Sequence, residues 1–201
     1  MTATRSPTIS QLLTNPAHEV LQATEDRRAE LARDIVAAAY LRGDFVLSSG
    51  KRSSYYFDKY LFETKPTVMR RLAGLLGEMV PPDVVRLAGP ELGAVALSAV
   101  VSLETGLPFV IVRKAPKSYA TASPIEGELH PGERVLVIED VISTGGEALA
   151  AAEKLRAAGA VVVGILGVID RQQGGSEAIA AAGLTFGALF RLDELIDGGV
   201  R

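Results

Sequence analysis

Four consecutive hydrophobic residues, Val135 to Ile138, are followed directly by two acidic residues, Glu139 and Asp140. An uninterrupted hydrophobic run of this kind is typical of a strand buried on both faces, which occurs mainly in parallel sheets covered by helices. In such sheets, ligands bind beyond the carboxyl ends of the strands. The run therefore favours an α/β fold and places two carboxylates where a functional site is expected.

Helix and strand patterns alternate on both sides of this run. Strands are predicted at 84–88, 109–113, 134–139 and 161–170, and helices at 94–105 and 147–158. Gly106 and Gly159 directly follow the two helices, where a left-handed residue often ends a helix. The alternation predicts a central, mostly parallel sheet that is flanked by helices.

The N-terminal part of the chain is predicted to form a smaller element. Residues 1–23 lack a clear period and are expected to be a loosely ordered arm. A helix is predicted from Glu25 to a C-terminal end at Gly43. Two short strands, at 45–47 and 55–58, would then form a hairpin or a small hood.

A second helix is predicted to start near Pro66, with an apolar stripe that ends at Met79. A chain of 201 residues suits one domain with a full hydrophobic core. We therefore expect a single domain over residues 24–201. Its hood elements are expected at about 24–62 and its core at about 63–201.

Composition and charge exclude several classes of function. The formal net charge of −3, without a long basic run, marks no surface for nucleic acid or for an anionic membrane. The chain has no cysteine, which excludes disulfides, thiolate metal sites and a cysteine nucleophile. No apolar stretch approaches the roughly 20 residues that span a bilayer. A small-molecule partner and a cytoplasmic location are expected.

The segment after the two carboxylates, Val141 to Gly146, is suited to binding a phosphate. It leads into a predicted helix, so backbone amides and the hydroxyls of Ser143 and Thr144 would converge at the positive end of the helix dipole. The carboxylates could accept hydrogen bonds from ribose hydroxyls. Alternatively, Glu139 and Asp140 merely end a strand, and Ser143 or Thr144 only caps the helix.

The stretch from Val135 to Gly146 resembles the phosphoribosyl diphosphate (PRPP) signature of the type I phosphoribosyltransferases. Within that family, the chain is similar to the members that act on orotate, and the segments at 47–56, 113–119, 125–127 and 170–175 carry this narrower match. The resemblance implies the type I phosphoribosyltransferase fold. It also implies transfer of the 5-phosphoribosyl group from PRPP to orotate, forming orotidine 5'-monophosphate and diphosphate in de novo pyrimidine (UMP) biosynthesis.

The resemblance assigns a set of PRPP-binding residues. These are Glu91, Leu92, Arg113, Lys114, Lys117, Tyr119, Glu139, Asp140, Val141, Ile142, Ser143, Thr144, Gly145 and Gly146. Catalytic roles are implied for Arg113, Lys114, Lys117 and Asp140. Residues 114–124 would form a lid over the diphosphate that reaches the neighbouring subunit's site. Read without the resemblance, Arg113 to Lys117 could be a solvated basic loop.

Tyr119 and Ala120 depart from the family pattern, since many members have His and Gly at these positions. The resemblance therefore implies diphosphate binding by Tyr119 and no proton-transfer role.

The residues implied to bind orotate are Ser49, Gly50, Lys51, Tyr56, Phe57, Ser143 and Arg171. The guanidinium of Arg171 suits a two-pronged contact with a carboxylate or a pyrimidine oxygen, although it could be an ordinary surface arginine. Ser48 stands where many bacterial members have a lysine. This leaves the orotate carboxylate or the diphosphate short of one cation unless Lys51 compensates.

The resemblance also implies a cofactor and an assembly. Mg²⁺ is expected to bind mainly through substrate and water, with no metal site made by protein groups alone. A homodimer is expected because the lid is shared between subunits. Two alternatives stay open, namely transfer to another base, since the signature recognises only the donor, and a PRPP-sensing regulator without turnover. The residues before Phe45 show no basic recognition helix that would favour the regulator.

Overall fold

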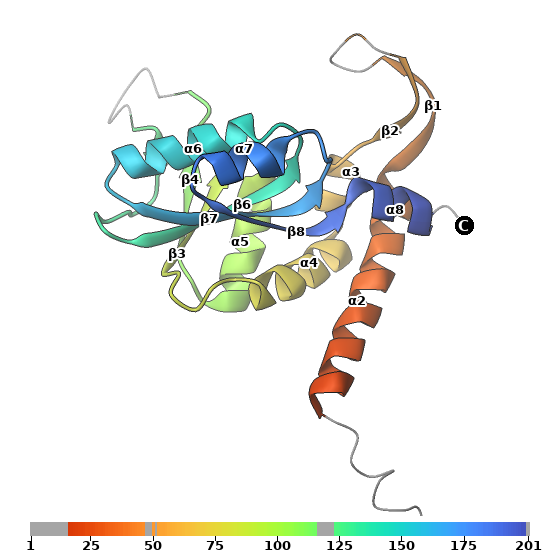
Figure 1. Ribbon diagram of the computed structural model, residues 1–201, viewed down its shortest axis with the longest axis horizontal. Helices are drawn as coiled ribbons and strands as arrows, with labels where there is room; N and C mark the ends of the chain where they lie inside the picture. Colours follow the sequence, from red (N-terminus) through yellow and green to blue (C-terminus); the bar gives the residue numbers. More distant parts are fainter. Residues whose placement is uncertain (1–15, 47–49, 51, 116–122, 200–201) are drawn as a thin grey trace, which may run out of the picture.

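A six-stranded sheet forms the centre of the protein (Figure 1). The computed structural model describes residues 16–46, 50, 52–115 and 123–199. The strands are β3 (Arg86–Pro90), β4 (Phe109–Val112), β5 (Ile125–Glu126), β6 (Arg134–Ile142), β7 (Val161–Asp170) and β8 (Thr185–Arg191). Their order is β5-β4-β3-β6-β7-β8, and all neighbours are parallel except β4 and β5. The predicted α/β class is confirmed.

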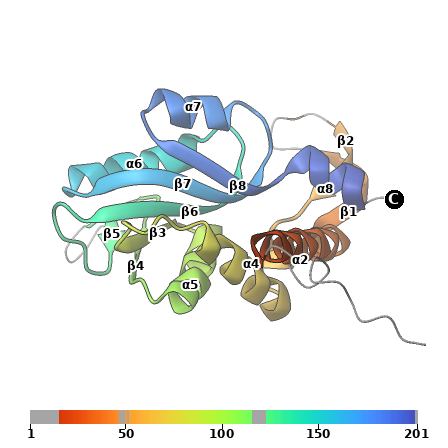
Figure 2. The same ribbon diagram turned by 60° about the horizontal axis from the view of Figure 1, so that its bottom comes forward.

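Helices cover both faces of this sheet (Figure 2). One face carries α6 (Gly146–Ala157) and α7 (Gly175–Ala181), and the other carries α4 (Pro66–Glu78) and α5 (Gly93–Thr105). Successive side chains of β6 enter different cores, because Leu136 and Ile138 belong to one buried cluster and Val135 and Val137 to the other. The prediction that this strand is buried on both faces is confirmed.

The hood is built from α2 (Pro16–Ala39), β1 (Tyr40–Val46), β2 (Arg52–Phe57) and α3 (Tyr60–Glu63). Strands β1 and β2 form an antiparallel hairpin away from the main sheet (Figure 1). Tyr40 and Tyr55 stack across it, with ring centroids 5.4 Å apart. The last described element is α8 (Leu192–Gly199), which packs against α2.

Two predictions for the N-terminal part are wrong. The helix begins at Pro16, inside the segment that was predicted to be a loosely ordered arm, while residues 1–15 lie outside the described chain. Gly43 does not end this helix but lies within β1, where the register with β2 shifts between Arg42 and Phe45. The helix ends earlier because Tyr40 and Leu41 pair with β2, a contact that helical periodicity does not reveal.

Other differences concern the ends of elements. β6 continues past the predicted end at Glu139 to Ile142, because Val141 and Ile142 pair with β7. Met79 lies outside the buried stripe of α4 and is exposed. The short strand β5 and the elements α3, α7, β8 and α8 were not predicted.

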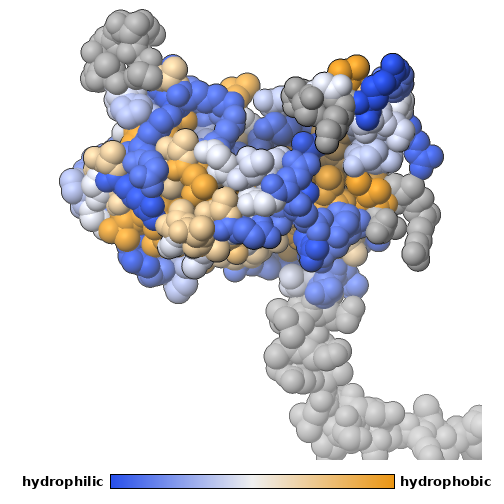
Figure 3. All heavy atoms as spheres, turned by 45° about the horizontal axis from the view of Figure 1, so that its top comes forward, coloured by the Kyte–Doolittle hydropathy of each residue, from blue (hydrophilic) through white to orange (hydrophobic). Residues whose placement is uncertain are grey.

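The outer surface is mixed in character. Figure 3 shows one face, on which hydrophilic residues are widespread and hydrophobic ones lie in small groups between them. None of the helices in the described ranges is both long and apolar enough to cross a membrane.

A buried ion pair joins the first residue of β3 to the turn before β6. The guanidinium of Arg86 donates two hydrogen bonds to the carboxylate of Glu133, at 2.6 and 2.8 Å. We expect Arg86→Met to lower the free energy of unfolding by about 3 kcal/mol, since it leaves a largely buried carboxylate without its partner. Urea denaturation followed by circular dichroism measures this loss. Arg134→Met is the control, because it breaks an exposed pair with Asp83 worth about 1 kcal/mol or less. Equal losses in the two variants would contradict the expectation.

Candidate functional site

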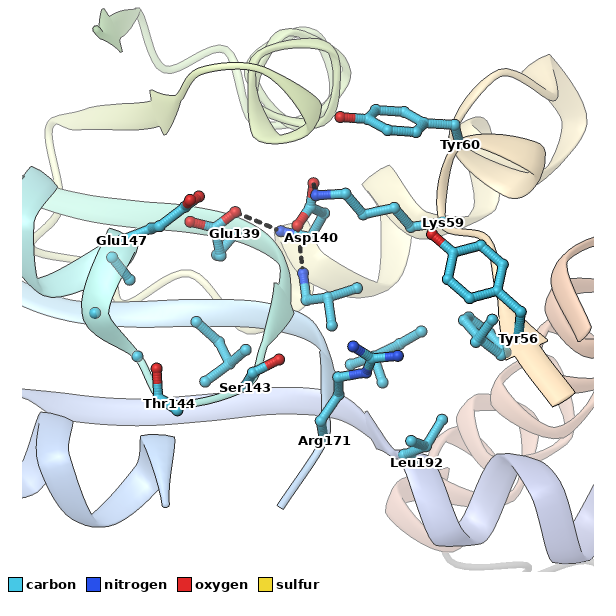
Figure 4. A pocket seen from close by; sticks show the side chains of 17 residues that line it. Tyr56, Lys59, Tyr60, Glu139, Asp140, Ser143, Thr144, Glu147, Arg171 and Leu192 are labelled. Carbon is cyan, nitrogen blue, oxygen red and sulfur yellow. Dashed lines mark hydrogen bonds and ion pairs between the residues drawn. The ribbon is translucent and has the colours of Figure 1, made fainter. Parts of the chain in front are cut away.

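A cavity of about 380 Å³ opens at the carboxyl end of β6, between the hood and the sheet (Figure 4). Its lining comes from β2, α3, the β6–α6 connection, β7 and α8. The lining residues are Tyr56, Phe57, Lys59, Tyr60, Glu139, Asp140, Val141, Ile142, Ser143, Thr144, Gly145, Gly146, Glu147, Ala148, Ile169, Arg171 and Leu192. The whole predicted segment from Glu139 to Gly146 therefore faces one cavity, together with Arg171.

The β6–α6 turn presents the start of a helix to this cavity. Gly145 has a positive φ of 78° and precedes α6, and no side-chain hydrogen bond of the described residues caps that helix. The alternative that Ser143 or Thr144 serves as the helix cap is therefore wrong. The first amides of α6 and its positive dipole end are oriented as an anion site requires.

Asp140 is the most deeply buried acid of the site, with 2% of its side chain exposed. One oxygen, Oδ1, accepts a hydrogen bond from the backbone amide of Val141 at 2.6 Å, and the other, Oδ2, accepts one from Nζ of Lys59 at 2.6 Å. Lys59 reaches this carboxylate from the hood side of the cavity (Figure 4). This ion pair joins the hood to the central strand.

Lys59 and Glu63 are site residues that the sequence did not indicate. Lys59 directly precedes the four-residue helix α3 and Glu63 is its last residue. A separation of four positions places two side chains on one side of a helix. Glu63 is only 6% exposed, and its Oε1 has no hydrogen-bond partner among the described residues. This spacing was the one feature of the sequence that could have identified the two residues. A four-residue helix is too short to show a helical period of hydrophobic residues, so it was not recognised.

Two carboxyl groups near Lys59, those of Glu63 and Glu139, have raised pKa values. Burial, followed by the negative charge of Asp140, raises the pKa of Glu63 to about 8. The same two causes raise the pKa of Glu139 well above its ordinary value. Burial lowers the pKa of the Lys59 ammonium, but the hydrogen bond and charge of Asp140 outweigh it, so the net shift is upward. At neutral pH, Lys59 is thus a cation.

The start of α5 packs closely against these acids. A Cβ atom added to Gly93 would lie 1.8 Å from Oδ2 of Asp140 and 2.9 Å from Oε2 of Glu63. Because such distances are far below normal contacts, only glycine fits at this position.

A second cavity of about 290 Å³ adjoins the first. Its lining includes Glu91 and Leu92, which the sequence reading assigned to PRPP, and Lys114. The Nζ of Lys114 lies 2.8 Å from Oε1 of Glu147, and its backbone amide donates to Oε2 of Glu91 at 3.0 Å. Arg113 lies farther from acids, with its NH1 atom 3.6 Å from Oε1 of Glu126 and 3.8 Å from Oε1 of Glu91. The structure thus brings Lys114 and the Glu91–Leu92 loop together.

The remaining predicted residues fall into three groups. Tyr56 and Phe57 line the first cavity, although Phe57 is buried and its ring centroid lies 6.2 Å from that of Phe62. Gly50 is exposed and lines neither cavity. The other four, Ser49, Lys51, Lys117 and Tyr119, lie outside the described residues.

Comparison with known proteins gives one consistent family. Residues 66–182 match the model of the phosphoribosyl transferase domain. The chain is 46% identical to an orotate phosphoribosyltransferase of Thermococcus gammatolerans, over 80% of this chain and 87% of that protein. It is 43% identical to an orotate phosphoribosyltransferase of Halobacterium salinarum, over 88% of this chain and 99% of that protein.

A solved structure is similar over nearly the same length. The crystal structure of Mycobacterium tuberculosis orotate phosphoribosyltransferase in complex with Fe(III) dicitrate superposes with a TM-score of 0.78 at 32% identity. This likeness covers 84% of the present chain and 98% of the other. A second crystal structure of the same enzyme, in complex with PRPP, has a TM-score of 0.73 at 32% identity, over the same shares of both chains.

The raised pKa of Glu63 makes stability depend on pH. Between its ordinary pKa of 4.5 and about 8, the folded chain holds a proton that the unfolded chain has released. The free energy of unfolding therefore falls as pH rises through this window, by up to about 1.4 kcal/mol per pH unit for one group. We expect Glu63→Gln, which cannot ionise, to reduce this slope in urea denaturation at pH 5, 6, 7 and 8. Glu104→Gln, at an exposed position of α5, serves as control. An unchanged slope in Glu63→Gln would disprove the assignment.

Proposed function

The chain belongs to the orotate phosphoribosyltransferases, within the phosphoribosyl transferase domain family, and from this premise we propose how its site works. It transfers the 5-phosphoribosyl group from PRPP to orotate and releases diphosphate. The product, orotidine 5'-monophosphate, is the precursor of UMP in de novo pyrimidine biosynthesis. The observation that carries this proposal is the buried pair Glu139 and Asp140 leading directly into an uncapped helix start, with Arg171 lining the same cavity.

The donor is proposed to span both cavities. Its 5'-phosphate binds at the β6–α6 turn, where Thr144, Gly145 and Gly146 present hydroxyl and amide donors at the positive end of α6. Its ribose hydroxyls donate to Glu139 and Asp140. Its diphosphate enters the second cavity, where Lys114 and the Glu91–Leu92 loop lie.

Orotate is proposed to bind in the first cavity, on the side of Arg171. The backbone amide of Arg171 donates to the carbonyl oxygen of Ile142 at 2.8 Å, which fixes this arginine against the end of β6. Its guanidinium offers the two parallel donors that a carboxylate or a pyrimidine oxygen pair requires. Ser143, Tyr56 and Phe57 line the same cavity, and Ser49, Gly50 and Lys51 are proposed to cover the pyrimidine from the hood.

The reaction requires charge stabilisation and no covalent bond to the protein. The bond from ribose carbon 1 to the diphosphate oxygen breaks with both electrons going to diphosphate. A ring nitrogen of orotate bonds to the same carbon, and its proton passes to the departing diphosphate. Cations fixed in a site of low water content stabilise the departing charge. We propose that Arg113 and Lys114 supply such cations here, that Lys117 adds another from a lid that closes over the diphosphate, and that Tyr119 of the same lid binds the diphosphate.

The carboxyl groups of Glu139 and Asp140, near the end of β6, suit a site for Mg²⁺, because this ion prefers oxygen ligands and retains several of its waters. Oε2 of Glu139 has no hydrogen-bond partner among the described residues and can accept one from a metal-bound water. The ion would be held mainly by diphosphate, ribose hydroxyls and water. When bound, it supplies further positive charge against the leaving group. Glu139 and Asp140 would position its waters.

The assembly and the location follow from the same proposal. A homodimer is proposed, in which each lid contributes Lys117 and Tyr119 to the partner's site. Water must be excluded during transfer, since it would otherwise hydrolyse the donor, and a shared lid serves this end. A cytoplasmic location is proposed, and neither nucleic acid nor a membrane is a proposed partner.

Turnover of orotate tests the proposed function directly. With Mg²⁺ and PRPP, we expect the purified protein to consume orotate, measured as loss of its absorbance, and to leave uracil and hypoxanthine unchanged.

Lys114→Ala should lower kcat for orotate by about 100-fold, because it removes one cation from the leaving group. Lys65→Ala, at an exposed position before α4, should retain wild-type rates. Turnover of another base instead of orotate would refute the acceptor assignment, and PRPP binding without turnover of any base would favour a regulator.

A further inference from the structure

Lys59 lies at the boundary between the two cavities. Five residues line both of them, and these are Lys59, Tyr60, Glu139, Asp140 and Glu147. Only one of the five is a cation. In PRPP, the 5'-phosphate and the diphosphate are attached on opposite sides of the ribose. A donor that spans both cavities therefore places carbon 1 of its ribose near this boundary. The argument therefore rests on the proposed function and concerns the donor half of the site.

The ammonium of Lys59 has unused hydrogen-bonding capacity. An ammonium group carries three N–H donors, and the one acceptor that the described residues provide is Oδ2 of Asp140, at 2.6 Å. The same ammonium lies 5.3 Å from the centroid of the Tyr60 ring. With 32% of its side chain exposed, Lys59 borders the open space of the cavities. Two donors are thus available to a ligand without breaking the ion pair.

The surroundings keep Lys59 charged without making the boundary strongly negative. Asp140 faces it from β6, Glu63 from α3 and Glu139 from the same strand as Asp140. Burial and the charge of Asp140 raise the pKa values of Glu63 and Glu139, so these carboxyls retain their protons more readily than ordinary ones. A polyanionic donor therefore meets the Lys59 ammonium beside two carboxyls that carry less negative charge than ordinary ones.

We propose that Lys59 is a substrate-binding cation of the donor site, which bridges Asp140 and the diphosphate oxygens of PRPP. It contacts the leaving group from the hood side, whereas Lys114 contacts it from the sheet side. The ammonium stays protonated throughout and stabilises the oxygen that receives the electrons of the breaking bond. Lys59 thereby supplies a cation in a hood that carries Ser48 where many family members have lysine.

The two lysines differ in how firmly they are held. The partner of Lys114, Glu147, is 71% exposed and Lys114 itself is 61% exposed, and pairs of this kind contribute little stability. Lys59 instead pairs with an acid that is almost completely buried. Its ammonium is therefore already positioned before the donor binds, which lowers the entropic cost of the contact. This difference predicts that Lys59 matters for both donor binding and transfer.

Kinetics of three variants test this role. We expect Lys59→Met, which keeps the length of the side chain but removes its charge, to lower kcat/KM for PRPP by about 100-fold. The KM for orotate should change little. Lys59→Arg keeps the charge and should retain activity within about tenfold of wild type. Lys65→Met, an exposed lysine six positions away, should match wild type.

Equilibrium binding separates a contact with diphosphate from a purely structural role. By calorimetry in the presence of Mg²⁺, Lys59→Met should bind inorganic diphosphate at least about tenfold more weakly, while its affinity for ribose 5-phosphate should stay within twofold of wild type. If the Met variant does not fold, Lys59→Gln provides the same comparison, with Lys59→Arg as the variant that keeps the charge. Wild-type affinity for diphosphate, or a rise in the orotate KM alone, would overturn the proposal. Because this binding experiment needs no orotate, it remains decisive even if orotate turnover fails.

Discussion

The burial of Asp140 is the constraint on which the arrangement of the site depends. A carboxylate that is almost wholly removed from water requires a cation and hydrogen-bond donors, since an uncompensated buried charge costs several kcal/mol. The backbone amide of Val141 and the ammonium of Lys59 meet this requirement. Since Lys59 belongs to the hood and Asp140 to the central strand, the same contact fixes how the hood sits over the cavity.

This constraint also determines the charge that a substrate meets. The negative charge of Asp140 adds to burial in raising the pKa values of Glu63 and Glu139, so these two carboxyls hold their protons more readily than ordinary ones. The positive end of α6 lies at one side of the cavity and Lys114 in the adjoining one. A donor with two separate phosphate groups matches this distribution of charge.

Local sequence patterns predicted the central part of the site and missed the parts made by long-range contacts. Four consecutive hydrophobic residues predict the strand that leads into Glu139 and Asp140. Glycines and hydroxyl side chains predict the phosphate-binding turn that ends at Gly146. Lys59 was missed because its partner stands 81 residues away and α3 is a single short turn. β8 was missed because its burial depends on pairing with β7, which the segment around Gly187 does not signal. The end of α2 was misplaced for a similar reason, since pairing with β2 decides it.

A double-mutant cycle between the hood and the central strand tests the central claim most directly. The free energy of unfolding would be measured for wild type, Lys59→Met, Asp140→Asn and the double variant. If the buried carboxylate and the ammonium stabilise each other, the coupling energy should be about 2 kcal/mol, because the second substitution costs little once the first is made. Additive losses, with a coupling energy near zero, would contradict the view that this ion pair joins the hood to the sheet.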